Sequence, residues 1–278
     1  MTWWQALILG IVEGVTEYLP VSSTGHLLLV QQWLGLRSAQ AQTVASDAYA
    51  IVIQAGAILA VFGLYWRRFA QMGRGLLGRD PVGLRLALNV GLAFAITGAI
   101  GITFEKTVKH YFFNVPAITA AWLVGGLAIL AVTYLRPQRP GMLPPRNMDS
   151  LTLPQAAIIG LMQVLAMWPG TSRSLITIVA GLLVGMGIGA AVEFSFLLGV
   201  VTLLAATGKE VYSNHQALAH NYSMLNMGVG FVVAGISAAF AVEWMVTYLK
   251  RHSLAIFGWY RVILAAVVGV LMILGLLS

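Results

Sequence analysis

Two glutamates near the beginning of the chain have the spacing of a functional pair. Glu13 and Glu17 are four residues apart, so on a helix both carboxylates project from the same face. The residues around them are apolar, and burying two acids in a bilayer costs several kcal/mol unless a cation neutralises them. The cation is either a divalent metal or Arg173, the nearest cation in a similar motif further along the chain. A fixed Glu–Arg pair that joins two segments is the structural alternative.

Serine and threonine side chains follow a proline at two places, Ser22, Ser23 and Thr24 after Pro20, and Thr171 and Ser172 after Pro169. Each group precedes an apolar run, which places hydroxyls at a helix N-terminus, where N–H groups and a partial positive charge bind anions. Plain N-capping is the alternative for either group alone. Two such ends with Arg173 between them favour a phosphate site, because a planar guanidinium holds two phosphate oxygens at once.

His26 is the histidine inside an apolar segment, while the other four lie in predicted loops. It comes three residues after Ser23, and folding of the segment into a hairpin would bring it near the carboxylates. An imidazole at that place can exchange a proton at neutral pH. The alternative is a histidine that only caps a helix end.

The composition is that of an integral membrane protein. Of the 278 residues, 59% are hydrophobic and 9% are charged, whereas soluble domains carry about 25% charged residues. Apolar runs of sufficient length predict six spanning helices, at residues 50–66, 86–104, 116–135, 192–207, 227–249 and 254–277. The protein is therefore expected to cross a membrane several times.

The distribution of charge predicts the orientation of these helices. Cationic residues gather in three alternate loops, around Arg67, Arg136 and Lys250, and these loops are therefore predicted to be cytoplasmic. We interpret the net charge of +7 as membrane topology, and no nucleic-acid partner is expected. The absence of cysteine excludes disulfides, cysteine nucleophiles and thiolate metal sites.

Two further apolar stretches, residues 3–36 and 153–184, are interrupted by proline, hydroxyl residues and a charge. Such breaks survive at membrane depth where the backbone is buried in protein or lines a cavity, so we expect helical hairpins that enter the membrane and return. The two stretches align with each other: Gly10 with Gly160, Glu13 with Gln163 and, after a gap of one residue, Pro20 with Pro169 and Ser23 with Ser172.

The aligned stretches indicate an internal repeat. Each half of the chain, about 1–140 and about 150–278, contains one broken hairpin and three predicted spans, and an odd number of crossings inverts the second half. The expected fold is an all-α polytopic membrane protein with one domain, residues 1–278. Its two inverted-topology repeats would each consist of a broken re-entrant hairpin plus three spanning helices, with the site near the midplane.

Two segments carry a family resemblance: Glu13-Gly-Val-Thr-Glu-Tyr-Leu-Pro-Val-Ser-Ser-Thr-Gly-His26 and Pro169-Gly-Thr-Ser-Arg-Ser174. They closely resemble the two signatures of the undecaprenyl-diphosphate phosphatases, the bacterial membrane enzymes of bacitracin resistance. The likeness extends to Glu193-Phe-Ser-Phe-Leu-Leu198 and Tyr260-Arg261, and so covers essentially the whole chain. Two positions depart from the family pattern, with Ile188 in place of an Arg and Val201 in place of a Pro, but neither lies in a signature.

The resemblance implies an activity and a location. The activity is hydrolysis of the C55 isoprenyl diphosphate to the monophosphate that carries peptidoglycan precursors, with a divalent metal as cofactor. The location is the bacterial inner membrane, with the site open to the outer, periplasmic side. The expected partners are the isoprenyl diphosphate and the lipid bilayer, and the sequence leaves open whether a homodimer forms.

We expect Glu13 and Glu17 to hold Mg²⁺ or Ca²⁺ together with diphosphate oxygens. Ser23 is the preferred nucleophile and His26 its acid/base, with Glu17 and Arg173 completing the catalytic group. A metal-activated water that uses the same residues is the alternative. The expected substrate-binding residues are Ser22, Thr24, Gly170, Thr171, Ser172, Ser174 and Arg261.

Two other functions compete with hydrolysis. An inverted-repeat transporter or flippase of a lipid phosphate or small anion would also have broken helices that meet at the midplane. Paired carboxylates would repel such an anion unless a metal lies between them, which favours metal-assisted hydrolysis. A structural scaffold would leave the buried charges of two matched breaks without a role. Glu193 and Arg261 are also predicted at membrane depth, where each either supports the site or forms an ion pair. A structural role is favoured for Glu193, and the alternatives stay open for Arg261.

Overall fold

The computed structural model describes residues 1–36, 40–135, 147–221 and 223–277, and these residues form helices joined by short connections. The predicted loop around Arg136 lies outside the described residues. The helices are α1 Trp3–Glu17, α2 Ser23–Trp33, α3 Gln40–Leu64, α4 Trp66–Leu76, α5 Pro81–Phe112, α6 Val115–Leu135, the 3-10 helix η1 Met148–Ser150, α7 Leu153–Gln163, the 3-10 helix η2 Val164–Met167, α8 Arg173–Leu183, α9 Ile188–Asn221, α10 Met224–Leu249 and α11 Ala255–Ile273.

Six helical segments are long and apolar enough to cross a membrane: Ser46–Leu64, Pro81–Phe104, Val115–Leu135, Ile188–Glu210, Met224–Leu249 and Ala255–Ile273. They match the six predicted spans, which confirms an all-helical, multi-pass membrane protein. The ends differ by a few residues because local caps set them. At α5, for example, the Asp80 side chain accepts a hydrogen bond from the Gly83 backbone N–H at 2.9 Å, and Pro81 begins the helix.

Each of the two interrupted stretches forms two short helices with a break between them, as expected. Their first helices begin alike: Gln5 accepts a hydrogen bond from the Thr2 backbone N–H at 2.8 Å, and Gln155 accepts one from Thr152 at 3.0 Å. This is half of a capping box, in which the side chain at the third helical position satisfies an N–H that the helix leaves unpaired. The inverted, re-entrant arrangement of the two stretches stays a prediction.

The chain divides into two compact units. The first unit contains Met1–Leu19, Ser23–Trp66 and Gly199–Met245, and the second contains Pro20–Ser22, Arg67–Leu198 and Val246–Ser278. Each unit takes residues from both predicted halves of the chain. The two compact units therefore do not coincide with the two predicted repeats. The single domain and its two repeats stay predictions.

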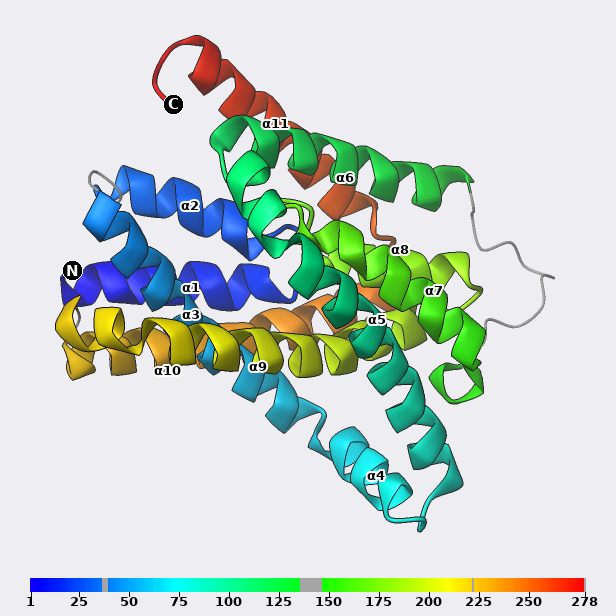
Figure 1. Ribbon diagram of the computed structural model, residues 1–278. Helices are drawn as coiled ribbons and strands as arrows, with labels where there is room; N and C mark the ends of the chain where they lie inside the picture. Colours follow the sequence, from blue (N-terminus) through cyan, green and yellow to red (C-terminus); the bar gives the residue numbers. More distant parts are fainter. Residues whose placement is uncertain (37–39, 136–146, 222, 278) are drawn as a thin grey trace. The chain divides into compact units, whose positions relative to one another are not determined.

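In the first unit, α1 packs against α2 and α3 (Figure 1), and glycines on α1 bring it close to α10. A Cβ added at Gly10 would come within 2.7 Å of the Gly230 carbonyl oxygen, and one at Gly14 would collide with the carbonyl oxygen of Ala234. Small residues at such contacts let helix backbones approach in a membrane, where hydrophobic burial does not drive helix association. The helix that carries Glu13 and Glu17 is thereby fixed along its length.

In the second unit, α6 lies beside α11, and α5 lies beside α7 (Figure 1). A Cβ at Gly126 of α6 would come within 2.9 Å of the carbonyl oxygen of Gly258 on α11. Thr97 of α5 donates a hydrogen bond to the Gly160 carbonyl oxygen at 2.7 Å and accepts one from the Gln163 amide at 3.1 Å. These contacts fix α7 and α11, which lead to the second break and to Arg261.

Helix α4 lies in the basic connection around Arg67 that is predicted to be cytoplasmic, and no helix was expected there. The segment is 11 residues long and contains Arg67, Arg68 and Arg74, so it is too polar and too short to cross a membrane. A Cβ at Gly83 would collide with the Gln71 carbonyl oxygen, so α4 and the first turn of α5 pack tightly. The sequence did not reveal this helix because an amphipathic helix of this length lacks the uniform hydrophobicity used to find spans. The cytoplasmic side of the connection stays a prediction.

Candidate active site

The carboxylate of Glu17 and the hydroxyl of Ser23 meet in the first unit. Glu17 is the last residue of α1 and Ser23 is the first residue of α2, so the intervening turn brings them together. The Ser23 hydroxyl donates a hydrogen bond to Glu17 Oε2. Both residues are buried, with 8% and 7% of their surfaces exposed. Two of the predicted catalytic residues are therefore in direct contact.

Glu13 lies one helical turn before Glu17, and its surface is 1% exposed. Its carboxyl group interacts with that of Glu17, which confirms that the two acids share one face of α1. Its Oε2 atom is buried and has no hydrogen-bond partner among the residues that the structure describes. A buried oxygen without a hydrogen-bond donor lowers the stability of the fold unless a cation or a donor from outside the chain binds it.

This pair of acids fits a hard cation that also binds the substrate. Among the described residues, no group of three or more His, Cys, Asp or Glu side chains is placed to hold a metal ion. Mg²⁺ is commonly held by one or two carboxylates plus substrate phosphates and water. Glu13 and Glu17 can supply the two carboxylates, so the donor set fits a metal that the diphosphate completes. The metal itself stays a prediction.

Thr24 and His26 lie on the first turn of α2. His26 is half-buried and comes three residues after Ser23, so both side chains lie on the same side of the helix. Thr24 is exposed. That His26 lies near the carboxylates, and that Thr24 contacts substrate, stay predictions.

Ser22 and Ser172 have nearly the same unusual backbone conformation. Their φ angles are +73° and +74°, and they are the non-glycine residues with positive φ in the described part of the chain. Each directly precedes a helix, α2 or α8. Left-handed φ at a non-glycine residue costs about 1–3 kcal/mol and persists where surrounding structure imposes it, often at functional sites.

These angles correct the alignment of the two breaks. The sequence alignment paired Ser23 with Ser172, after a gap of one residue, but the backbone pairs Ser22 with Ser172. Ser23 therefore corresponds to Arg173, since each is the first residue of its helix. The gap of one residue was wrong because the alignment paired the two prolines. The two backbones instead match at the turns that directly precede α2 and α8. The candidate nucleophile and the candidate phosphate-binding cation thus occupy equivalent positions.

At the second break, hydroxyl groups organise the start of α8. The Ser172 hydroxyl accepts a hydrogen bond from the Leu175 backbone N–H at 3.3 Å and lies 2.9 Å from the Ser174 hydroxyl. Ser172 is thus an N-cap, which was the alternative interpretation of these residues. The Thr171 hydroxyl is buried and has no hydrogen-bond partner among the described residues. It is the hydroxyl at this break best placed to serve a ligand.

Arg173 is partly buried, and its Nη1 donates to the Ser195 carbonyl oxygen at 3.2 Å. The Ser195 hydroxyl lies 2.6 Å from that of Thr177, which is on the same helix as Arg173. Helix α9 therefore fixes both the side chain of Arg173 and the helix that carries it. In the sequence, Ser195 was noted only within the segment Glu193–Leu198, to which the family resemblance extends. Its place between two phenylalanines is the signal that could have marked it as a functional residue.

Arg261 is fully buried in the second unit, with 0% of its surface exposed. Its guanidinium donates to four backbone carbonyl oxygens, those of Trp122 at 3.3 Å, Pro20 at 3.3 Å, Ala121 at 2.8 Å and Gly170 at 2.8 Å. Pro20 lies in the first break and Gly170 in the second, so one side chain holds the two breaks together. The predicted contact of Arg261 with substrate stays a prediction, whereas its binding to the two breaks is what the structure describes.

Close approach of α6 makes this position of Arg261 possible. A Cβ at Gly125 would collide with the Arg261 guanidinium, and one at Gly170 would come within 2.8 Å of the Ile118 carbonyl oxygen. Trp122, also fully buried, donates from its indole Nε1 to the Val21 carbonyl oxygen at 3.0 Å. Sequence analysis missed Trp122, although a tryptophan in the middle of a span, far from the headgroups, was a signal.

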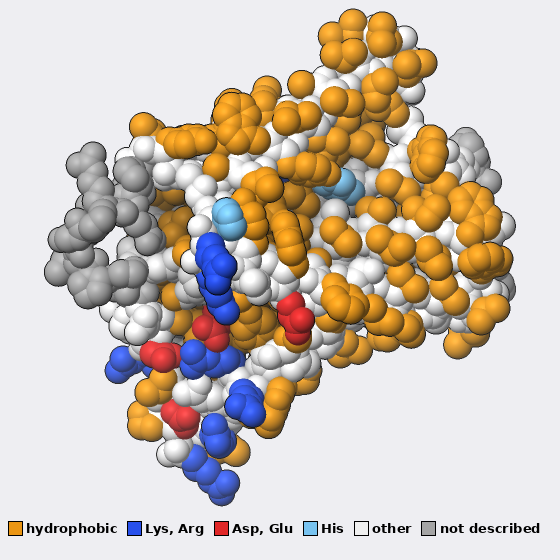
Figure 2. All heavy atoms as spheres, turned by 180° about the vertical axis from the view of Figure 1, so that it is seen from behind, with side chains coloured by type: hydrophobic (Ala, Val, Ile, Leu, Met, Phe, Trp, Pro, Cys, Tyr) orange, Lys and Arg blue, Asp and Glu red, His pale blue; other side chains and the backbone are white. Residues whose placement is uncertain are grey.

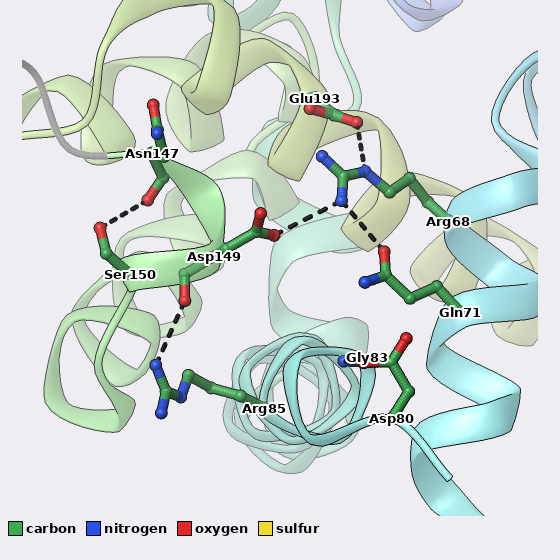
Figure 3. Close-up of polar contacts among 9 residues, drawn as sticks. All are labelled: Arg68, Gln71, Asp80, Gly83, Arg85, Asn147, Asp149, Ser150 and Glu193. Carbon is green, nitrogen blue, oxygen red and sulfur yellow. Dashed lines mark hydrogen bonds and ion pairs between the residues drawn. The ribbon is translucent and has the colours of Figure 1, made fainter.

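Glu193 belongs to a separate polar cluster in the second unit (Figure 3). Arg68 Nε donates to Glu193 at 2.8 Å, and its Nη1 lies 3.4 Å from Asp149 and 3.0 Å from the Gln71 side-chain oxygen. The hydrogen bond and the charge of Glu193, with the charge of Asp149, raise the pKa of Arg68 above its ordinary value against the opposing effect of burial. Of the two roles left open for Glu193, the structure shows an ion pair, which agrees with the structural role favoured from the sequence.

Together, the fold and the buried acids define a class: a multi-pass helical membrane protein with a carboxylate–serine pair at one helix break and a second, matching break. The chain belongs to the family described as bacitracin resistance protein BacA, whose family model matches residues 6–267. It is 43% identical over 273 residues to a protein named undecaprenyl-diphosphatase from Sorangium cellulosum, which covers 96% of this chain and 86% of that protein. It is 42% identical over 264 residues to undecaprenyl-diphosphatase 2 from Rhodospirillum rubrum, with 95% and 93% of the two chains covered.

Proposed function

We propose that this protein is a membrane phosphatase that hydrolyses undecaprenyl diphosphate to undecaprenyl phosphate and inorganic phosphate. The observation that carries the proposal is the hydrogen bond from Ser23 to Glu17, two buried polar groups in the segment that resembles the family signature. The names of relatives that match nearly the full length of the chain support the same substrate. Family membership also supports a role in bacitracin resistance.

Glu17 is positioned to activate Ser23. In the proposed reaction, the serine oxygen attacks the terminal phosphorus while its proton passes to Glu17, and the bond to the bridging oxygen breaks. The lipid monophosphate leaves as His26 donates a proton to its former bridging oxygen. Water then attacks the phosphorus of the phosphoserine and gives a proton back to His26, the bond from phosphorus to the serine oxygen breaks, and that oxygen takes back the proton held by Glu17. Direct attack by a water held at the same acids is the competing route.

The diphosphate carries several negative charges, so its binding requires cationic groups. We assign its recognition to Arg173 and to the start of α8, including the Thr171 hydroxyl, because the contact with Ser195 holds Arg173 at that helix end. Glu13 and Glu17 would hold Mg²⁺ or Ca²⁺. When bound, this metal supplies positive charge that balances the acids and the diphosphate oxygens.

We further propose that the protein lies in the bacterial inner membrane as two inverted repeats, with its site open to the periplasmic side. The matching capping glutamines and the matching Ser22 and Ser172 angles support a repeat. Because the chain has no cysteine, single cysteines introduced near Lys250 and near Gly35 can be labelled with a membrane-impermeant maleimide. Labelling of the Gly35 position alone in intact cells is expected, and the opposite pattern would overturn the orientation.

The test of the function is product identification. Purified protein in detergent is incubated with C55 diphosphate and Mg²⁺, and lipid products and inorganic phosphate are quantified together. Equal amounts of monophosphate lipid and phosphate are expected. If folded protein in several lipids released no phosphate but moved a lipid phosphate across proteoliposomes, the protein would be a transporter instead.

A further inference from the structure

The second unit contains a cavity of about 500 Å³ that lies apart from both breaks. It lies where α6 and α8 end, where α9 begins, and beside the turn between α10 and α11. Its walls are formed by Val132, Thr133, Leu182, Met186, Ile188, Leu249, Lys250, Arg251, His252, Ser253 and Leu254. Cavities of this size are large enough for a small molecule or a lipid headgroup.

The cavity has one cationic, polar side. Lys250 and Arg251 are exposed, and neither has an ion-pair partner among the described residues. No acidic side chain is among the residues that form the walls. On the whole face that Figure 2 shows, Lys and Arg side chains gather in one region together with a few Asp and Glu side chains, whereas hydrophobic side chains cover most of the rest. The charge of the cavity therefore favours an anion.

The backbone of the turn does not supply this anion site. The N–H groups of Lys250, Arg251 and His252 are bonded to carbonyl oxygens in the last turn of α10. The His252 ring stacks on Tyr248 at 4.4 Å, and its Nδ1 lies 3.2 Å from the Tyr248 carbonyl oxygen. The turn is thus a closed structure that presents side chains, and recognition of an anion depends on Lys250 and Arg251.

The other side of the cavity is apolar. Met186, Leu249 and Leu254 are buried, with 3%, 6% and 5% of their surfaces exposed. Ile188, one of the two positions where the chain departs from the family pattern, continues this wall. A free phosphate ion would use only the cationic side, whereas a phosphate attached to a hydrocarbon chain would use both.

We propose that this cavity binds the phosphate headgroup of a lipid, with Lys250 and Arg251 on the phosphate and the apolar wall against the first part of its chain. Cations at the ends of membrane spans attract anionic lipid headgroups, and the cavity lies at the ends of four spanning helices, where α6 and α10 end and where α9 and α11 begin. The site does not depend on the proposed phosphatase activity, since none of its residues belongs to either break.

The test measures binding of three probes to the full-length protein in detergent: dioctanoyl phosphatidic acid, farnesyl phosphate and inorganic phosphate. The variant is Lys250→Gln/Arg251→Gln, and its control is Arg67→Gln/Arg79→Gln, which removes the same charge from exposed residues outside the cavity. Loss of two cations near the headgroup is expected to weaken binding of the lipid phosphates by about 30-fold, against less than about twofold in the control.

Thr133→Trp, which fills the cavity without a change of charge, is expected to weaken lipid binding as well. Stronger binding of farnesyl phosphate than of phosphatidic acid would identify an isoprenoid as the ligand, and the reverse a membrane phospholipid. Equal losses in the two double variants, or inorganic phosphate that binds as tightly as the lipids, would overturn the proposal.

Discussion

Arg261 on α11 donates a 2.8 Å hydrogen bond from Nη2 to the carbonyl oxygen of Gly170 in the second break. Through Nη1 it also binds the carbonyl oxygen of Pro20 in the first break. A residue far along the chain thereby fixes the segments that lead into Ser23 and Arg173. In this account Arg261 positions the site, because its described hydrogen bonds go to the backbone.

Arg261→Lys tests this positioning role. A lysine ammonium lacks the planar fork and cannot reach all four carbonyls, and each orphaned buried acceptor costs about 1–3 kcal/mol. We expect the free energy of unfolding to fall by about 3 kcal/mol. We also expect kcat to fall about 100-fold, with a smaller change in KM. Thermal unfolding in detergent and steady-state kinetics measure both, with exposed Arg67→Lys as control. Wild-type kcat and Tm would show that other contacts hold the breaks.

Substitutions of Ser172 separate its two local effects. Ser172→Ala removes the cap on Leu175 and keeps a side chain at positive φ, whereas Ser172→Gly removes the cap but relieves the backbone. The alanine variant is expected to lose about 1 kcal/mol of stability, and the glycine variant only a few tenths of that. Chemical or thermal unfolding gives the order. If alanine were the more stable variant, the positive φ would not matter to the fold.

Glu13→Gln tests the metal. One buried oxygen of its carboxylate has no hydrogen-bond partner in the described part of the chain, and a neutral amide is a weaker ligand for a hard cation. We expect the Mg²⁺ concentration that gives half-maximal phosphate release to rise at least about tenfold, and chelator to stop wild-type turnover. Full activity after chelation would remove the metal from the mechanism.

Arg68→Gln tests the polar cluster of Figure 3. The folded protein raises the pKa of Arg68, so its contribution to stability is complete below the ordinary pKa of arginine and is lost only as pH rises through the still higher folded value. The variant should therefore be destabilised equally at about pH 7 and about pH 9, by about 1 kcal/mol because the pair is partly exposed. Unequal Tm changes at the two pH values would require another titrating group.

The sequence predicts the spans and the site motifs because those depend on local composition. Six apolar runs bounded by charge gave six spanning helices, and the four-residue spacing of Glu13 and Glu17 was enough to place them on one face. Proline followed by hydroxyl residues marked both breaks. The contact of Ser23 with Glu17 follows from the length of the turn between them.

Other features depend on tertiary contacts that leave little trace in sequence. The hydrogen-bond partners of Arg261 are backbone carbonyl oxygens. Because every residue has one, no pattern of side chains predicts which of them Arg261 binds. The correct pairing of Ser22 with Ser172 depends on a φ angle, whereas an alignment weighs the nearby prolines more heavily. The close packing of Gln71 on α4 against Gly83 on α5 is likewise a tertiary contact that hydropathy does not report.

The carboxylate–serine pair performs the hydrolysis in the proposed mechanism, and Glu17→Gln tests this role most directly. Phosphate release from C55 diphosphate is measured for wild type, for Glu17→Gln and for Glu243→Gln, a control that changes an exposed glutamate on α10. Turnover is predicted to fall about 10²–10⁴-fold in Glu17→Gln and to stay unchanged in the control, with all three proteins equally folded. A wild-type rate in Glu17→Gln would contradict the account.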